Sequence, residues 1–201
     1  MEIDALETFE KSLSFDLTDP YYYIDKNALS KETCQGIIDL FESLPQHKGI
    51  TGGGLNTDMK RTYEVLIEGD VWNEYDTILC QSLSLALKKY SLHLINTCNN
   101  FTLRDKNLTD TGYQIQKYIK YDGFYEWHTD ERINNQKSAR TITFLWYLND
   151  IEEGGETYFY NGKVKPEAGK LILFPATWTY NHKGNMPKSH DKYIITGWVS
   201  Y

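Results

Sequence analysis

The chain has 201 residues, of which 40% are hydrophobic and 24% charged, a composition that suits one globular domain with its own core and excludes a disordered chain. No run approaches the roughly 20 apolar residues of a membrane-spanning helix, and a net charge of −7 disfavours nucleic acid as a partner. The opening "MEIDALETFEKSL" lacks a basic segment followed by an apolar run, so we expect no secretory signal and a cytoplasmic location. The three cysteines are scattered, which is typical of reduced thiols.

Two segments in the first half carry helical patterns. Residues 29–44 place apolar side chains on one face behind a serine suited to the N-cap. Residues 70–97 carry the same periodicity over a longer stretch, and Asp70 is a candidate cap. Between them, residues 49–61 are rich in glycine and predict a mobile loop. A phosphate-binding loop is the alternative, but the segment lacks the Gly-Lys-Ser or Gly-Lys-Thr ending of that motif. The sequence leaves open whether residues 1–20 form a flexible segment.

From residue 112 the pattern changes to short runs with a period of two. β-Branched and aromatic residues recur in "YQIQKYIKY", "RTITFLWYLN", "ETYFY", "GKLILFPATW" and "KYIITGWVSY", separated by turn-forming residues. Helices followed by a series of strands predict an α+β fold, with the helices packed on one face of a β-sandwich or barrel.

The stretch "YDGFYEWHTDE" raises the possibility of a metal site. If residues 125–131 form a strand, His128 and Asp130 point to the same face and offer a nitrogen and a carboxylate oxygen together. Two such ligands hold a metal poorly, and a hydrogen-bonded histidine–aspartate pair without metal is the alternative. A third ligand would decide between them.

Two histidines in the C-terminal part of the chain are candidates for that third ligand. We favour His182, because it follows "FPATWTYN" at the expected end of a strand, over His190, which lies in a turn. Two histidines with one carboxylate leave three coordination positions open, an arrangement suited to non-haem Fe(II) and oxygen. Zinc more often takes three or four ligands including cysteine, and no cysteine lies near these residues in the sequence.

These residues and their spacing resemble a known family. "HTD", a histidine 54 residues later at His182, and Lys192 ten residues beyond it are similar to the Fe(II)/2-oxoglutarate-dependent dioxygenases, and more narrowly to the prolyl 4-hydroxylase-like branch. The resemblance covers roughly residues 112–198, with a weaker match at "YYYIDKNALSKETCQGIIDLFE". It implies a double-stranded β-helix, or jelly roll, as the metal-binding core over residues 112–201 of a single domain, residues 1–201.

The resemblance also implies roles for particular side chains. His128, Asp130 and His182 would hold Fe(II), and Lys192 would pair with the far carboxylate of 2-oxoglutarate, since a buried carboxylate without a partner is costly. The remaining candidates are Tyr118, Tyr147 and Thr196 on the cosubstrate side and Tyr125, Arg140 and Trp198 on the substrate side. Each of the last three has an alternative as a core aromatic or surface charge.

The implied reaction couples oxidative decarboxylation of 2-oxoglutarate by O2 to hydroxylation of an aliphatic C–H, releasing succinate and CO2, with ascorbate as reductant. We expect a prolyl residue of a peptide or protein as the substrate, with residues 49–61 and 131–139 as possible lids over it; the oligomeric state stays open. The alternatives are another side chain or small metabolite as the C–H donor, a nucleic-acid demethylase, and a β-sandwich binding module without turnover. The demethylase is disfavoured by the acidic balance, and the binding module by Lys192.

Overall fold

The computed structural model describes residues 19–100, 102–103, 106–132 and 139–200. Most of the predicted N-terminal segment and the central part of the predicted lid at residues 131–139 therefore lie outside the described residues. Among the described residues, no helix is long and apolar enough to span a membrane.

The two predicted helices are present. α2 (Lys31–Ser43) begins at Ser30, whose side chain accepts a hydrogen bond from the backbone N–H of Thr33 and so satisfies one free donor of the first turn, as predicted. α3 (Asn73–Cys98) follows a short 3-10 helix η1 (Asp70–Trp72) and ends at Asn99, which adopts a left-handed conformation. The prediction that Asp70 caps this helix is wrong: Trp72 is at the N-cap, and its side chain makes no capping hydrogen bond.

Apart from a second short 3-10 helix, η2 (Trp178–Tyr180), the remaining elements of the described residues form two β-sheets. The larger sheet has eight strands, and seven of them run in the order β1-β11-β8-β13-β6-β4-β2, with β5 paired to β13. Their bounds, in chain order, are β1 (Tyr23–Asp25), β2 (His47–Lys48), β4 (Tyr63–Leu66), β5 (Thr109–Asp110), β6 (Gln114–Tyr118), β8 (Arg140–Tyr147), β11 (Leu171–Pro175) and β13 (Lys192–Ser200). The smaller sheet has the order β10-β9-β12-β7-β3, formed by β3 (Lys60–Arg61), β7 (Phe124–His128), β9 (Thr157–Phe159), β10 (Gly162–Val164) and β12 (His182–Gly184).

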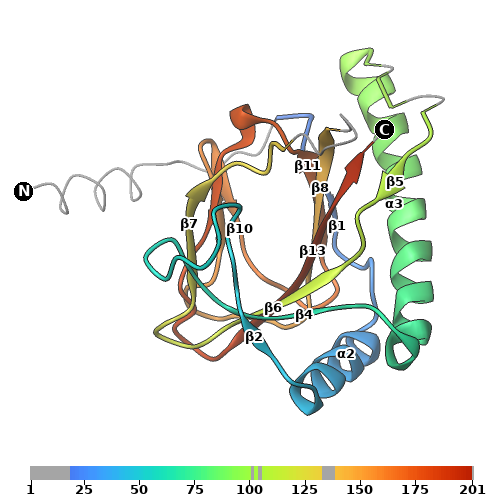
Figure 1. Cartoon of the computed structure of the whole chain (residues 1–201). Helices are drawn as coiled ribbons and strands as arrows, with labels where there is room; N and C mark the ends of the chain where they lie inside the picture. Colours follow the sequence, from blue (N-terminus) through green and yellow to red (C-terminus); the bar gives the residue numbers. More distant parts are fainter. Residues whose placement is uncertain (1–18, 101, 104–105, 133–138, 201) are drawn as a thin grey trace, which may run out of the picture.

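The central strands of the larger sheet are buried on both faces. Alternate residues of β8 and β11, such as Trp146 and Leu173, pack in one cluster with buried side chains of α2 and α3. The residues between them, such as Tyr147 and Phe174, pack in a second cluster with Phe159 of the smaller sheet. Figure 1 accordingly shows both helices on the outer side of the larger sheet, with the smaller sheet across from it. The period of two seen in the sequence is thus the alternation between a helix-facing and a sheet-facing core.

The structure is mostly β-sheet with a few helices, consistent with the jelly-roll fold that the resemblance implied. It differs from the sequence predictions in three places near the candidate site. The strand predicted over residues 125–131 ends at His128, the predicted loop 49–61 ends in strand β3, and His182 begins β12 rather than ending the strand before it. Short strands of two to four residues also join both sheets before residue 112, where a period of two has no room to be recognised.

Candidate metal centre and its cavity

The two candidate histidines are partners on adjacent strands. His128 is the last residue of β7 and His182 the first of β12, and the antiparallel register places their Cα atoms opposite each other. Their rings lie 4.3 Å apart between centroids. Each ring has its Nδ1 against a backbone carbonyl oxygen two residues earlier, that of Glu126 at 2.7 Å and that of Tyr180 at 3.0 Å. A carbonyl only accepts, so Nδ1 carries the proton in both rings and Nε2 is left with a free lone pair.

Asp130 faces both of these lone pairs. Its carboxylate oxygens lie 3.9 Å from Nε2 of His128 and 3.6 Å from Nε2 of His182. The hydroxyl of Thr143 donates to Oδ2 of Asp130 at 2.8 Å and holds the carboxylate in this orientation. One ligand atom from each of the three residues lies within 4.8 Å of the others. The structure thus brings the three predicted ligands together, although Asp130 lies just beyond the strand and not within it.

The protonation states favour a cation at this point. Burial and the neighbouring His182 lower the pKa of His128 to about 3, which keeps its ring neutral at neutral pH. Burial raises the pKa of Asp130, but the two histidines and the bond from Thr143 lower it by more, so the group is a carboxylate. Two imidazole lone pairs and a carboxylate that converge without a proton between them match the ligand set of a divalent metal.

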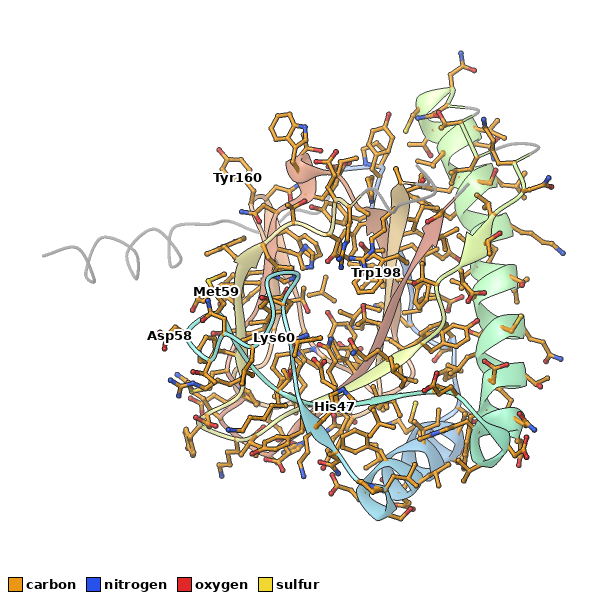
Figure 2. All side chains as sticks on the ribbon, in the orientation of Figure 1. His47, Asp58, Met59, Lys60, Tyr160 and Trp198 are labelled. Carbon is orange, nitrogen blue, oxygen red and sulfur yellow. The ribbon has the colours of Figure 1, made fainter. Side chains whose placement is uncertain are left out.

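A cavity of about 350 Å³ opens beside the three ligands. Of the ten residues predicted for the site, nine line it: Tyr118, Tyr125, His128, Asp130, Arg140, His182, Lys192, Thr196 and Trp198. Tyr147 does not line the cavity, but its hydroxyl donates a hydrogen bond to Thr157, whose side chain does line it. The cavity lies between the two sheets, and Figure 2 shows Lys60 of the smaller sheet and Trp198 of the larger sheet on its two sides.

Lys192 is the most unusual charged group of this cavity. Its side chain is fully buried, and its Nζ makes no hydrogen bond within the described part of the chain. Burial lowers its pKa to about 7, with Glu156 opposing the shift. The ammonium lies 4.5 Å from the centroid of the Tyr118 ring and 5.8 Å from that of Tyr147, which supply only weak cation–π stabilisation. A buried cation without a partner is the expected counterpart of a ligand carboxylate.

The three hydroxyl groups predicted beside Lys192 are already donors to protein atoms. Tyr118 donates to the side chain of Gln116 at 3.1 Å, Tyr147 to Thr157 at 2.7 Å and Thr196 to the carbonyl oxygen of Phe144 at 3.1 Å. With the hydroxyls in this arrangement, Lys192 is the one of the four predicted cosubstrate residues whose donors are free to meet a carboxylate.

The predicted substrate residues line the cavity in two pairs. Tyr125 stacks on His128 with ring centroids 3.5 Å apart, so it covers one face of a candidate ligand. Arg140 lies with its guanidinium 3.3 Å from the Trp198 ring centroid, which fixes both side chains through a cation–π contact. Neither pair is a plain core contact, because all four side chains border the cavity.

Sequence reasoning missed several polar residues of this cavity. Gln114 and Gln116 alternate with Ile115 along β6 and face the cavity while Ile115 faces the helices. Lys60 and Glu64 form a buried ion pair, and Lys60 also lines the cavity. The period of two in "YQIQKY" was sufficient to place both glutamines on one face. The two-residue strand that carries Lys60 follows a glycine-rich stretch and gave no such signal.

Comparison with known proteins confirms the predicted resemblance. The sequence profile described as the 2OG-Fe(II) oxygenase superfamily matches residues 113–200, which contain every predicted site residue. Over this region, which is less than half of the chain, the sequence is similar to the 2OG-Fe(II) oxygenases. It is 32% identical over 104 residues to probable prolyl 4-hydroxylase 9 of Arabidopsis thaliana, covering 40% of this chain and 36% of that protein. It is 25% identical over 189 residues to probable prolyl 4-hydroxylase 3 of the same plant, covering 78% and 58%. The chain thus spans less than two thirds of the length of these curated relatives.

Solved structures of prolyl hydroxylases have a fold similar to that of this chain. A prolyl hydroxylase from Trichoplax adhaerens, in complex with a peptide fragment of the hypoxia inducible factor oxygen degradation domain, superimposes with a TM-score of 0.67 at 22% identity, covering 98% of this chain and 92% of that one. The viral collagen prolyl hydroxylase of Paramecium bursaria Chlorella virus-1, in a 2OG complex, gives 0.65 at 22% identity, covering 90% and 96%.

The buried ammonium yields a prediction for the ligand-free protein. We expect Lys192→Met to raise the free energy of unfolding, by up to about 5 kcal/mol at pH 6, because one unit of pKa shift corresponds to about 1.4 kcal/mol. The pKa of Lys192 is about 7 in the folded protein and has its usual value of 10.5 in the unfolded chain. Between these two pH values the unfolded state therefore binds more protons than the folded state. The stability of the parent protein therefore rises with pH over this window, and the difference between the two proteins shrinks. Urea unfolding of both proteins from pH 6 to pH 10 measures this difference in the free energy of unfolding.

Lys31→Met serves as the matched control, since Lys31 is exposed and its ion pair with Asp150 lies on the surface. We expect a change below about 0.5 kcal/mol at every pH. A difference for Lys192→Met that is independent of pH would contradict the assignment of Lys192 as a buried, uncompensated charge.

Proposed function

We propose that this protein hydroxylates an aliphatic C–H, most specifically that of a prolyl residue in a peptide or protein, with Fe(II), 2-oxoglutarate and O2, and releases succinate and CO2. The observation that carries this proposal is one cavity that holds two histidine lone pairs, a carboxylate and a buried ammonium without a partner. The peptide-bound Trichoplax structure and the prolyl 4-hydroxylase relatives support a peptide or protein as the substrate. The proposal includes a double-stranded β-helix core over residues 112–201 within a single domain.

In this proposal each side chain has a defined task. His128, Asp130 and His182 hold the iron, and the carbonyl bonds at Nδ1 keep both Nε2 atoms aimed at it. Lys192 pairs with the distal carboxylate of 2-oxoglutarate, which repays the cost of burying its charge. Bound Fe(II) supplies the redox chemistry that couples cosubstrate decarboxylation to C–H oxidation.

The other cavity residues orient the two organic molecules and exclude water. Tyr118 and Thr196 line the cosubstrate end, and Tyr147 supports it through the bond from its hydroxyl to Thr157. Tyr125, Arg140 and Trp198 border the substrate end, and their stacking contacts keep this wall rigid. Three free cysteines among the described residues agree with a reducing, cytoplasmic setting, and ascorbate is the reductant we expect to sustain turnover.

The direct test is turnover by the purified protein. We expect succinate release with Fe(II), 2-oxoglutarate and ascorbate, and a gain of one oxygen atom by members of a panel of proline-containing peptides, read by mass spectrometry. Succinate release with oxygen gain only by free amino acids or other side chains would support the alternative substrates. No 2-oxoglutarate consumption under these conditions would favour a binding module without turnover.

The choice of the distal histidine has its own test. We expect His182→Ala to abolish turnover and to weaken Mn(II) binding, measured by calorimetry, at least a hundredfold. His190→Ala is the matched control, because His190 contacts the carbonyl oxygen of Asp150 and the carboxylate of Glu152 instead of the triad. It should keep both properties within about threefold. The reverse result would assign the third ligand to His190.

Lys192 should act on the cosubstrate and not on the metal. We expect Lys192→Ala to weaken 2-oxoglutarate binding to the Mn(II)-loaded protein at least thirtyfold, because the distal carboxylate loses its ion pair in a buried site. Binding of Mn(II) alone should change less than threefold. Equal losses of both would contradict the assigned role.

A further inference from the structure

A continuous hydrogen-bonded chain runs along one wall of the cavity and ends at a buried ion pair. The carboxylate of Glu64 on β4 is fully buried and pairs with Lys60 of β3, with Lys60 Nζ 2.5 Å from Oε1. Gln114 donates from Nε2 to Oε2 of Glu64 at 3.0 Å. Gln116 donates to the amide oxygen of Gln114 at 3.0 Å, and the hydroxyl of Tyr118 donates to the amide oxygen of Gln116 at 3.1 Å.

The charge of Glu64 sets the direction of this chain. A carboxylate only accepts hydrogen bonds, so Gln114 must turn its NH2 group toward Glu64 and its oxygen toward Gln116. Gln116 is then oriented in the same sense, and Tyr118 has to donate. A primary amide can point either way, so without Glu64 the two glutamines would have no fixed orientation. In the low local dielectric of a buried site, the hydrogen bonds of such a chain strengthen one another.

Among the described residues, each glutamine of this chain keeps one N–H without a hydrogen-bond partner, and both side chains line the cavity. Each glutamine amide has two N–H bonds, and the chain uses one of each. Lys60 has three, one directed to Glu64 and its ammonium also lying 4.7 Å from the Tyr125 ring centroid. All three side chains line the cavity, and Tyr125 in turn stacks on His128. The wall beside the candidate ligand therefore offers donors, and the matching chemical groups are carbonyl oxygens.

We propose that Glu64 is a positioning residue that aligns Gln114 and Gln116, so that these amides and Lys60 donate hydrogen bonds to the backbone carbonyl oxygens of a bound peptide. The negative charge of Glu64 balances the positive charge of Lys60, so this wall carries no net charge that would attract a free anion. A segment rich in proline suits it particularly well, because prolyl residues carry carbonyl acceptors and no backbone N–H. This inference rests on the proposed function for its substrate class, and it assigns the recognition to residues outside the metal and cosubstrate set.

Acetyl-decaproline amide is the probe that tests this inference, since its backbone offers carbonyl acceptors at every residue. We would measure its Kd by calorimetry with the protein loaded with Mn(II) and 2-oxoglutarate without O2, and the Kd of 2-oxoglutarate itself in the same series. Glu64→Gln keeps the shape of the side chain but removes its charge and its fixed acceptor character. We expect the decaproline Kd to rise about tenfold while the 2-oxoglutarate Kd changes less than twofold.

Glu42→Gln is the matched control. Glu42 also pairs with a lysine and a tyrosine, Lys117 at 2.9 Å and Tyr193 at 2.7 Å, but it does not line the cavity. It should leave both dissociation constants unchanged. Glu64→Gln leaves Lys60 buried without its counter-charge, so Gln114→Leu provides a second variant that breaks the chain with the ion pair intact. We expect it to weaken decaproline binding at least fivefold with the same selectivity over 2-oxoglutarate.

The outcomes separate this inference from the proposed function. Unchanged decaproline binding in folded Glu64→Gln or Gln114→Leu, an equal loss of 2-oxoglutarate binding, or no decaproline binding by a parent protein that releases succinate would each overturn the inference. Absence of succinate release by the parent protein would refute the proposed function instead, and it is measured independently of the peptide affinities.

Discussion

The site depends on two buried charges, those of Asp130 and Lys192, neither of which forms an ion pair with a lysine, arginine or acidic side chain among the described residues. Asp130 faces two imidazole nitrogens that have no proton to give it, and Lys192 lies fully buried without a hydrogen bond among the described residues. Each arrangement is unfavourable in the empty protein. Under the proposed function, a divalent cation and a ligand carboxylate in the same cavity would balance these charges. The fold supplies the stability that keeps these groups in place.

The arrangement of the two sheets explains how these groups meet. The smaller sheet contributes the histidines from β7 and β12, and the larger sheet contributes Lys192 from β13. The larger sheet is held on its other face by α2 and α3, so that its central strands are buried on both sides. A rigid strand is a better support for Lys192 than a loop, because the ammonium must stay buried when no ligand is present.

Much of the site could be predicted from the sequence because its parts lie in segments with a clear period. The triad, Lys192 and the β6 tyrosine all belong to the region that matches the oxygenase profile, and the alternation along β8, β11 and β13 identified the buried strands. The N-terminal contributions were harder to predict. β3 has two residues and follows glycines, so neither Lys60 nor its partner Glu64 could be recognised as buried. Their burial depends on strand pairing across a distance in sequence that no local pattern encodes.

His128 and His182, two candidate metal ligands, pair directly across adjacent strands. The two residues occupy one rung of an antiparallel ladder, and an irregularity between His182 and Gly184 shifts the register immediately beyond it. A slip of one residue in this ladder would turn one imidazole to the opposite face of the sheet. Both imidazoles can face Asp130 only when these two strands, which are distant in the sequence, pair in this register.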